Sequence, residues 1–419
     1  MLSALAHAHT PKFLCASRLS ASPRTTVSAT SMSSSVVRIA VVGDIHDLWN
    51  LEEDTKALQF LKVSLNGGLS YDVVFDICKK KHVCYRASEY PMTGEWGLFD
   101  LVSECIRGYV LKVETRLGAI YRQVLFSIVV YLPTGQPGDF GNENVDLVQS
   151  VADLEFPKAV ILGNHDSWRT QEFSGKKKNR VQLQLECLGE EHVAYRSLDF
   201  PMLKLSVVGG RPFSHGTERM FRKRLLSSRY GVEDIDGSAK RIYKAALGVP
   251  GDHLVIFLAH NGPTGLGSEG NDICGKDWEV GGGDYGDPDL AQAIALLKET
   301  TKFCIPLVVF GHMHKQLGDG GLRKMIAFGT DNTIYLNGAI VPRVKRLIDN
   351  QGTVNTSIMN NETSLATADS RGTTRAFTLV EIVDGRVDKI AETWVAVVGD
   401  MTTLQEEHIL FKHGDEVLP

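Results

Sequence analysis

The chain has 419 residues, enough for one large domain or two ordinary ones with a substantial core. A hydrophobic fraction of 43% and a charged fraction of 23% are globular values, which argues against a disordered chain. No apolar run reaches the roughly 18 residues of a membrane-spanning helix. The net charge of −5 lacks the basic balance of nucleic-acid-binding proteins. The composition therefore predicts a soluble protein without nucleic-acid or membrane partners.

Cysteine usage indicates the redox compartment. The chain has 7 cysteines, an odd number, and no Cys-x-x-Cys pair. This pattern favours a reducing compartment and argues against a zinc ribbon or a disulfide framework.

The first 35 residues differ in composition from the rest of the chain. No acidic residue occurs before Asp44, Ser, Thr and Ala dominate, and Lys12, Arg18 and Arg24 are spread through the tract. Many hydroxyls without acids are typical of an organellar transit peptide. The excess of Ser over Arg favours a chloroplast over a mitochondrion. The alternative is an untargeted, disordered tail on a cytoplasmic protein.

The ordered chain is predicted to begin with a strand at Val36–Val42. This run is almost entirely apolar and β-branched, as in a strand buried on both faces, and it ends at Gly43. Similar short apolar runs at residues 159–162, 254–259 and 306–310 each end just before a polar block. Because ligands bind at the carboxyl ends of strands in layered α/β proteins, we expect these blocks to meet at one edge.

Further elements follow from periodicity and turn signals. Helices are predicted at Leu51–Lys62, Val145–Leu154, Asn179–Leu188, Glu218–Ser228, Ser238–Leu247 and Asp289–Leu297. Residues 264–287, dense in Gly and Asp, are predicted to form a long loop that covers the site. Residues 375–383 and 387–397, joined by Asp384-Gly385, are predicted to form a hairpin. We expect a single domain over residues 36–399, with a polar loop at 350–371 and a C-terminal tail at 400–419.

The spacing after the first helix is unusual. Asp44 and Asp139 lie 95 positions apart, whereas a strand, helix and strand close in about 30 residues. Residues 133–137 contain two prolines and cannot form a central strand, although residues 124–132 are strand-like. Residues 63–136 are therefore predicted to be an atypical insertion. Either a retained intron in the gene sequence or an inserted subdomain explains it.

Five short polar blocks carry the chemistry. They are Asp44-Ile45-His46, Gly138-Asp139, Gly163-Asn164-His165-Asp166, His260-Asn261-Gly262 and Gly311-His312-Met313-His314. Carboxylates, imidazoles and an amide oxygen suit Mn, Fe or Zn ions. Each block alone is a weak signal, but the five in this order, after apolar strands, predict a dinuclear metal centre.

This ordered set resembles the calcineurin-like metallophosphoesterase superfamily, of the type found in plants and cyanobacteria. The resemblance implies a layered α/β sandwich of β-sheets flanked by helices, with the active site at the carboxyl ends of strands. It also implies two divalent metal ions as cofactors. The first would be bound by Asp44, His46 and His314, the second by Asn164, His260 and His312, and both by Asp139.

The resemblance further implies hydrolysis of a phosphomonoester or phosphodiester by a metal-bridging hydroxide. His165 would protonate the leaving oxygen. Asp166 either fixes the tautomer of His165, and so belongs to the catalytic set, or caps a helix. Asn142, Asn144, Arg211, His215 and the 264–287 loop are candidates for contact with a small phosphorylated substrate.

Two other functions remain open at this point. One is a catalytically weak or inactive scaffold with the same fold. The presence of every expected metal ligand argues against it. The other is a nuclease, which the acidic net charge disfavours.

Overall fold

The computed structural model describes residues 36–43, 45, 48–64, 124–129, 142–173, 177–347 and 372–414, without the side chains of 63–64 and 124–129. All of these residues belong to one unit, Ser35–Pro419. Among them, no helix has the length and apolar character needed to cross a membrane. The predicted transit peptide, the 350–371 loop and most of the predicted insertion lie outside the described residues.

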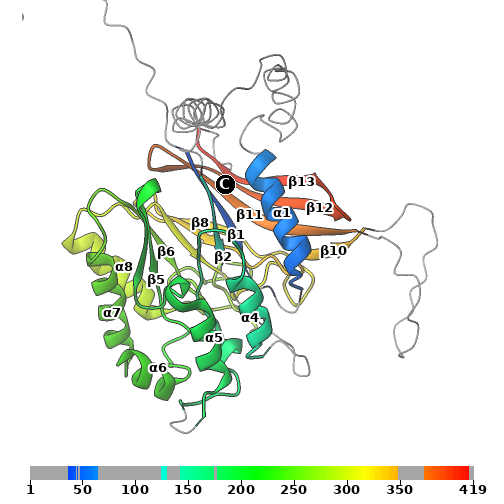
Figure 1. Ribbon diagram of the computed structural model, residues 1–419. Coiled ribbons are helices and arrows are strands. Elements are labelled where there is room, and N and C mark those ends of the chain that lie inside the picture. The colour runs from blue at the N-terminus through cyan, green and yellow to red at the C-terminus, as the bar shows by residue number, and fades with distance from the viewer. Residues whose placement is uncertain are drawn as a thin grey trace, which may run out of the picture. The chain divides into compact units, whose positions relative to one another are not determined.

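The described strands form two sheets, one of seven and one of six strands (Figure 1). The first has the order β13-β12-β11-β1-β2-β3, with β10 beside β11. Its strands are β1 (Val36–Val42), β2 (Val124–Val129), β3 (Lys158–Ala159), β10 (Val344–Arg346), β11 (Thr373–Val383), β12 (Arg386–Val398) and β13 (Met401–Lys412). The second has the order β4-β5-β6-β7-β9-β8. Its strands are β4 (Ser197–Phe200), β5 (Leu205–Gly209), β6 (Leu254–Leu258), β7 (Leu307–Phe310), β8 (Ile326–Phe328) and β9 (Ile334–Asn337).

The described helices flank these sheets. They are α1 (Leu51–Ser64), α4 (Val145–Ala152), α5 (Arg180–Leu188), α6 (Lys223–Tyr230), α7 (Ile235–Leu247) and α8 (Pro288–Thr300). In Figure 1, α1 runs beside β12 and β13, whereas α7 and α8 lie side by side. Side chains cap the first turns of some of these helices: Asn50 accepts from the amide of Glu53 in α1, and Asp234 accepts from that of Gly237 in α7.

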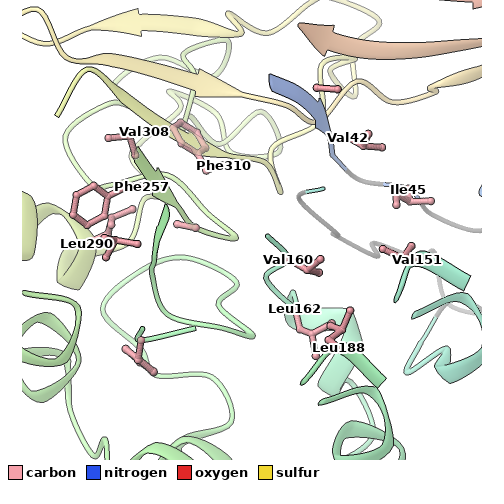
Figure 2. Close-up of a cluster of buried hydrophobic side chains, with 14 of the residues drawn as sticks. Val42, Ile45, Val151, Val160, Leu162, Leu188, Phe257, Leu290, Val308 and Phe310 are labelled. Carbon is pink, nitrogen blue, oxygen red and sulfur yellow. The ribbon is translucent and has the colours of Figure 1, made fainter. Parts of the chain in front are cut away.

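Alternating side chains of the central strands enter two different cores. Ile39 and Val41 of β1 pack with Ile256 and Leu258 of β6 between the two sheets. Val42, the next residue of β1, and Phe257, between the two β6 residues, belong to the other core, which is shared with the helices (Figure 2). Both faces are therefore apolar, which explains the unbroken apolar runs in the sequence. The layered α/β prediction is confirmed.

The parallel strands are the part of the fold that matters for the site. β1, β2 and β3 are parallel, as are β5, β6, β7 and β9. The strand-like run at residues 124–132 supplies β2, which pairs with both β1 and β3. The strand between β1 and β3 in the sheet is thus the described strand that precedes Asp139 in the chain.

Some boundaries differ from the sequence prediction. The helix expected from Glu218 begins only at Lys223, because Arg222 has a left-handed backbone (φ 56°) and bonds to Ser167 and Trp168 instead. Met401–Lys412, expected in a tail, pairs with β12 as β13. The predicted hairpin is present as β11 and β12.

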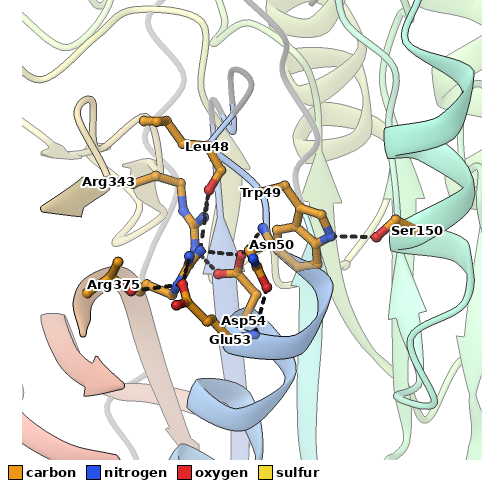
Figure 3. A network of polar contacts seen from close by, with 9 residues as sticks. Leu48, Trp49, Asn50, Glu53, Asp54, Ser150, Arg343 and Arg375 are labelled. Carbon is orange, nitrogen blue, oxygen red and sulfur yellow. Dashed lines mark hydrogen bonds and ion pairs between the residues drawn. The ribbon is translucent and has the colours of Figure 1, made fainter. Parts of the chain in front are cut away.

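A buried ionic network fixes the chain just beyond His46 (Figure 3). Asp54, with no exposed surface, binds Arg343 at 2.6 Å and Arg375 at 2.6 Å. Both guanidinium groups also reach the carbonyl oxygen of Leu48, at 3.3 Å. The segment that leads from the first motif into α1 is therefore tied to β11 and to the residue before β10.

We predict that Asp54→Ala lowers the free energy of unfolding by about 3–5 kcal/mol, because it leaves buried guanidinium charge without its main partner. Denaturant unfolding measures the change. The matched control is Glu52→Ala on the same helix, whose side chain is 76% exposed and pairs with Lys56. That exposed pair is worth at most about 1 kcal/mol. Equal losses for the two variants would contradict the role given to Asp54.

Candidate functional site

Six of the nine predicted site residues lie within the described chain: Asn164, His165, Asp166, His260, His312 and His314. Asp44, His46 and Asp139 lie outside the described residues, although Gly43 and Ile45 beside Asp44 are described. The geometry of the site is therefore built from the blocks that follow β3, β6 and β7.

Backbone hydrogen bonds bring these blocks together. β6 and β7 are parallel, and the amide of Gly311 donates to the carbonyl oxygen of His260 at 3.0 Å. On the other side of His260, the amide of Asn164 approaches its Nε2 at 3.4 Å. The blocks at Asn164, His260 and His312 consequently meet, but not at one edge of a single sheet as expected: β3 belongs to one sheet, and β6 and β7 belong to the other.

Two glycines permit this close approach. A Cβ atom on Gly163 would lie 2.4 Å from the His260 ring, and a Cβ on Gly43 would lie 2.4 Å from the carbonyl oxygen of Gly338. Gly338 in turn donates to the carbonyl oxygen of Phe310 at 2.7 Å. Only glycine fits at such separations. Gly43, which precedes Asp44, thereby lies against the chain that borders the His312 block.

Asn164, His260 and His312 form a tight cluster. Asn164 Oδ1 lies 2.9 Å from His260 Nε2, and the His260 and His312 ring centroids are 4.8 Å apart. Burial, together with the His312 imidazole, lowers the pKa of His260 well below its usual value. His312 has a backbone φ of 70°, in the left-handed region that only a few per cent of non-glycine residues adopt.

This cluster supplies an amide oxygen and two imidazoles, which are part of the ligand set that a divalent metal ion needs. His260 is fully buried in its neutral form, the form that binds metals, and its Nδ1 has no hydrogen-bond partner in the described structure. Within the described ranges, no group of three or more His, Cys, Asp or Glu side chains is placed to hold a metal. The carboxylates expected to complete the centre are Asp44 and Asp139, which lie outside those ranges.

His165 contacts residues that the motif does not include. Its Nδ1 lies 2.7 Å from Asn142 Oδ1, and its ring stacks on Trp168 with centroids 4.6 Å apart and planes within 3°. An amide oxygen only accepts, so Nδ1 carries the proton. Asn142, expected to contact substrate, instead orients His165, while Asn144 caps α4 through the amide of Leu147.

The structure favours one of the two roles left open for Asp166. Asp166 Oδ2 accepts from the amide of Gly163 at 2.8 Å and closes the short 3₁₀ helix Asn164–Ser167. Burial raises the pKa of Asp166 well above its usual value, and the nearby charge of Glu143 adds to the rise. Asp166 is therefore a cap, and the contact to His165 Nδ1 comes from Asn142.

Arg211, a candidate for reading the substrate, is instead buried in an ion-pair network. It lies 2.7 Å from Asp287 and 3.1 Å from Asp289, and all three side chains are at most 1% exposed. Ser214 also donates to Asp287 at 2.5 Å. This network joins the loop after β5 to the end of the 264–287 loop, so Arg211 positions these loops.

One guanidinium cannot neutralise two buried carboxylates, and this imbalance affects the pKa of Asp287. Burial raises the pKa of Asp287 from 3.8 to about 7, and the charge of Asp289 adds to this rise, against the opposing effect of Arg211. Since the folded-state pKa exceeds the unfolded value, the folded protein holds a proton that the unfolded chain has released. The contribution of Asp287 to the free energy of unfolding is therefore greatest below about pH 4, and it is lost as the pH rises through 7.

We predict that Asp287→Asn removes the decrease in folding stability that Asp287 causes as the pH rises. Chemical unfolding at pH 5, 6, 7 and 8 measures it: wild-type stability should fall relative to the variant as pH rises. Asp236→Asn, at an exposed position on α7, serves as the control and should run parallel to wild type. A constant difference between wild type and Asp287→Asn would contradict the assignment.

Comparisons with known proteins bear on this site. No curated protein matches the chain. A solved structure described as GAP50, the anchor in the inner membrane complex of Plasmodium, aligns with 92% of this chain and 91% of its own at 12% identity and a TM-score of 0.31, too low to inform fold or function. Residues 131–316 match the calcineurin-like phosphoesterase family. This segment includes the Asn164, His260 and His312 blocks, so the match supports the superfamily resemblance.

Proposed function

We propose that the protein is a metal-dependent phosphoesterase that hydrolyses a phosphomonoester or phosphodiester. The observation that carries the proposal is the contact between Asn164 Oδ1 and His260 Nε2, 2.9 Å apart, beside the His312 ring. An amide oxygen and two imidazoles lie together where parallel strands end, in the segment that matches the phosphoesterase family.

The residues that would hold the ions follow from this arrangement and from the motif order. Asn164, His260 and His312 would bind one ion; Asp44, His46 and His314 would bind the other; and Asp139 would bind both. When bound, such ions offset phosphoryl charge and lower the pKa of water. The proposed ions are Mn, Fe or Zn, for which a mixed set of carboxylate, amide and imidazole ligands is suited.

His165 is the proposed proton donor. Because Nδ1 donates to Asn142, Nε2 is the nitrogen that can pass a proton to the leaving oxygen. Asn142 is itself held in place: the amide of the next residue, Glu143, donates to the carbonyl oxygen of His165 at 3.1 Å. Asn142 is thus a positioning residue, and Asp166 keeps the turn that carries Asn164 and His165.

We predict that His165→Ala lowers kcat by about 100-fold or more, with metal content unchanged, because it removes the acid but no ligand. Asp139→Asn should instead lose both ions together, because it removes the shared charge. Turnover with added Mn²⁺ and elemental analysis of the same preparations separate the two effects.

Met202→Ala provides the control, since Met202 is 89% exposed and lies beside the start of β6, at the opposite end of the strands. It should change neither turnover nor metal content. One ion or none in well-folded wild-type protein would refute the two-metal proposal. Two bound ions without turnover on any phosphoester would favour the scaffold alternative.

We also propose that residues 1–35 target the protein to chloroplasts, on the basis of their acid-free, Ser-rich composition. A reporter fused to Met1–Ser35 should localise to plastids, and a chain lacking this segment should keep its catalytic activity. A fusion in which Arg18 and Arg24 are changed to Glu is the control and should lose import. Diffuse cytosolic fluorescence from the unaltered fusion would contradict the proposal.

A further inference from the structure

An unbroken series of ring contacts runs along the candidate site. Beyond the stack of His165 on Trp168, the Trp168 and Phe221 centroids are 5.9 Å apart, and those of Phe221 and His215 are 4.8 Å apart. His215 and Tyr285 follow at 6.3 Å, with ring planes within 12°. We call Trp168, Phe221, His215, Tyr285 and Trp278 the aromatic arc.

The aromatic arc returns to the site at its other end. The Tyr285 ring lies 5.9 Å from that of His312 with planes within 15°, and His312 lies 4.8 Å from His260. His260 contacts Asn164, which directly precedes His165 in the chain, so the series of rings begins and ends beside the same turn. The arc therefore joins the proposed acid to the proposed metal ligands. Trp278 extends it outward with an edge contact to Tyr285 at 4.9 Å.

The two tryptophans of the arc are left open to solvent. Trp168 is 45% exposed and Trp278 is 57% exposed, whereas Trp394 elsewhere in the chain is 5% exposed. Leaving large rings in water forgoes much of the stabilisation that their burial would give. Exposed apolar surface at the border of a polar site commonly marks a place where ligand binds.

The rings are held in fixed positions by their surroundings. The Arg222 guanidinium lies 4.2 Å from the Phe221 ring centroid, and Arg222 Nε donates to the carbonyl oxygen of Ser167 at 2.6 Å, beside Trp168. On the other side, Asn261 Nδ2 donates to the carbonyl oxygen of Tyr285 at 2.5 Å. A Cβ on Gly216, next to His215, would lie 2.2 Å from that same oxygen. A binding surface that is already ordered loses little entropy on ligand binding.

We propose that the aromatic arc is a substrate subsite that stacks against a planar ring carried by the leaving group. This inference rests on the proposed phosphoesterase function and specifies its substrate class: phosphoesters bearing a nucleobase or an aryl group. The arc begins at His165, where the leaving oxygen would be protonated, so a ring attached through that oxygen lies next to Trp168. Stacking is indifferent to the substituents of the ring, so the arc selects for a flat aromatic group.

Calorimetric titration of the full chain carrying His165→Ala, with Mn²⁺ present, tests the proposal through binding, because this variant is expected to keep its ions while turnover is suppressed. The ligands are adenosine monophosphate, phenyl phosphate and glycerol 3-phosphate, which share a phosphate but not a ring. We expect at least one ring-bearing ligand to bind about 10-fold more tightly than glycerol 3-phosphate. Preference for adenosine monophosphate would indicate a nucleobase, and preference for phenyl phosphate a simple aryl group.

Three variants locate the effect. Trp278→Ala and Trp168→Ala should each reduce the preference for the ring, with glycerol 3-phosphate binding unchanged, whereas Trp278→Phe should retain most of it. Met202→Ala is the exposed apolar control and should match wild type. Equal binding of all three ligands, no binding of any, or equal loss for ring-bearing and plain ligands in the tryptophan variants would overturn the proposal.

Turnover of phenyl phosphate and glycerol 3-phosphate separates this proposal from the proposed function. Ring-dependent binding with no turnover of either compound would contradict the phosphoesterase function and leave the aromatic arc as a ligand site. Turnover of both at equal efficiency, without ring-dependent binding, would contradict the arc and support the phosphoesterase.

Discussion

The candidate site depends on the close approach of the chain at Gly163 to the His260 imidazole. A side chain at Gly163 would occupy the space of the ring, since its Cβ would lie 2.4 Å from it. This approach places Asn164 Oδ1 within 2.9 Å of His260 Nε2 and thereby joins a block that follows β3 to a block that follows β6. The two blocks come from different sheets, so the packing of the sheets decides whether the site exists. The apolar side chains between the sheets, such as Ile39 and Ile256, are therefore as necessary to the site as its polar residues.

Burial sets the protonation of the groups around this contact. It keeps His260 neutral and raises the pKa of Asp166, so that neither adds uncompensated charge to the interior. The Asp54 network and the Arg211 network instead place buried carboxyl groups against guanidinium groups, and each holds a segment that borders the site. Because buried ion pairs give little net stability, their main contribution here is to fix the position of those segments.

The sequence predicted the strands that deliver the motif blocks because these strands are buried on both faces and read as short apolar runs. It did not predict β5, β9 or β13, whose runs are shorter or more polar, nor the aromatic arc. Trp168, Phe221 and Tyr285 belong to three separate segments, and their contacts depend on tertiary structure. The one local signal was Trp168, three residues after His165.

The roles of single polar residues likewise depend on tertiary contacts that the sequence does not reveal. Residue type and order grouped Asn164, His260 and His312, whereas Asp166 had two chemically reasonable roles and Asn142 was only a candidate for substrate contact. The contacts of Asn142 with His165 and of Asp166 with Gly163 distinguish these roles. Likewise, the choice between substrate contact and structural ion pair for Arg211 depends on the positions of Asp287 and Asp289.

The strand that precedes Asp139 ends well before this residue. Val41 of β1 is level with Ile128 of β2, which is level with Ala159 of β3. From that level, Asp44 is three residues along the chain and Asn164 is five, but Asp139 is eleven. Strand β2 alone therefore leaves the position of Asp139 loosely defined.

The chain on the carboxyl side of Asp139 is strongly anchored. The buried Glu143 carboxylate accepts from the amides of Arg169 at 2.8 Å and Thr170 at 2.6 Å. Arg180 donates to the backbone carbonyl oxygen of Glu143 at 2.7 Å. Three peptide units join Asp139 to Asn142, a reach of about 10 Å, and Asn142 contacts His165. Asp139 itself lies outside the described residues, but the covalent chain limits its distance from Asn142 to this reach. In the proposed metal centre, the contribution of Asp139 would then depend on the anchor at Glu143 more than on the length of the segment that precedes Asp139.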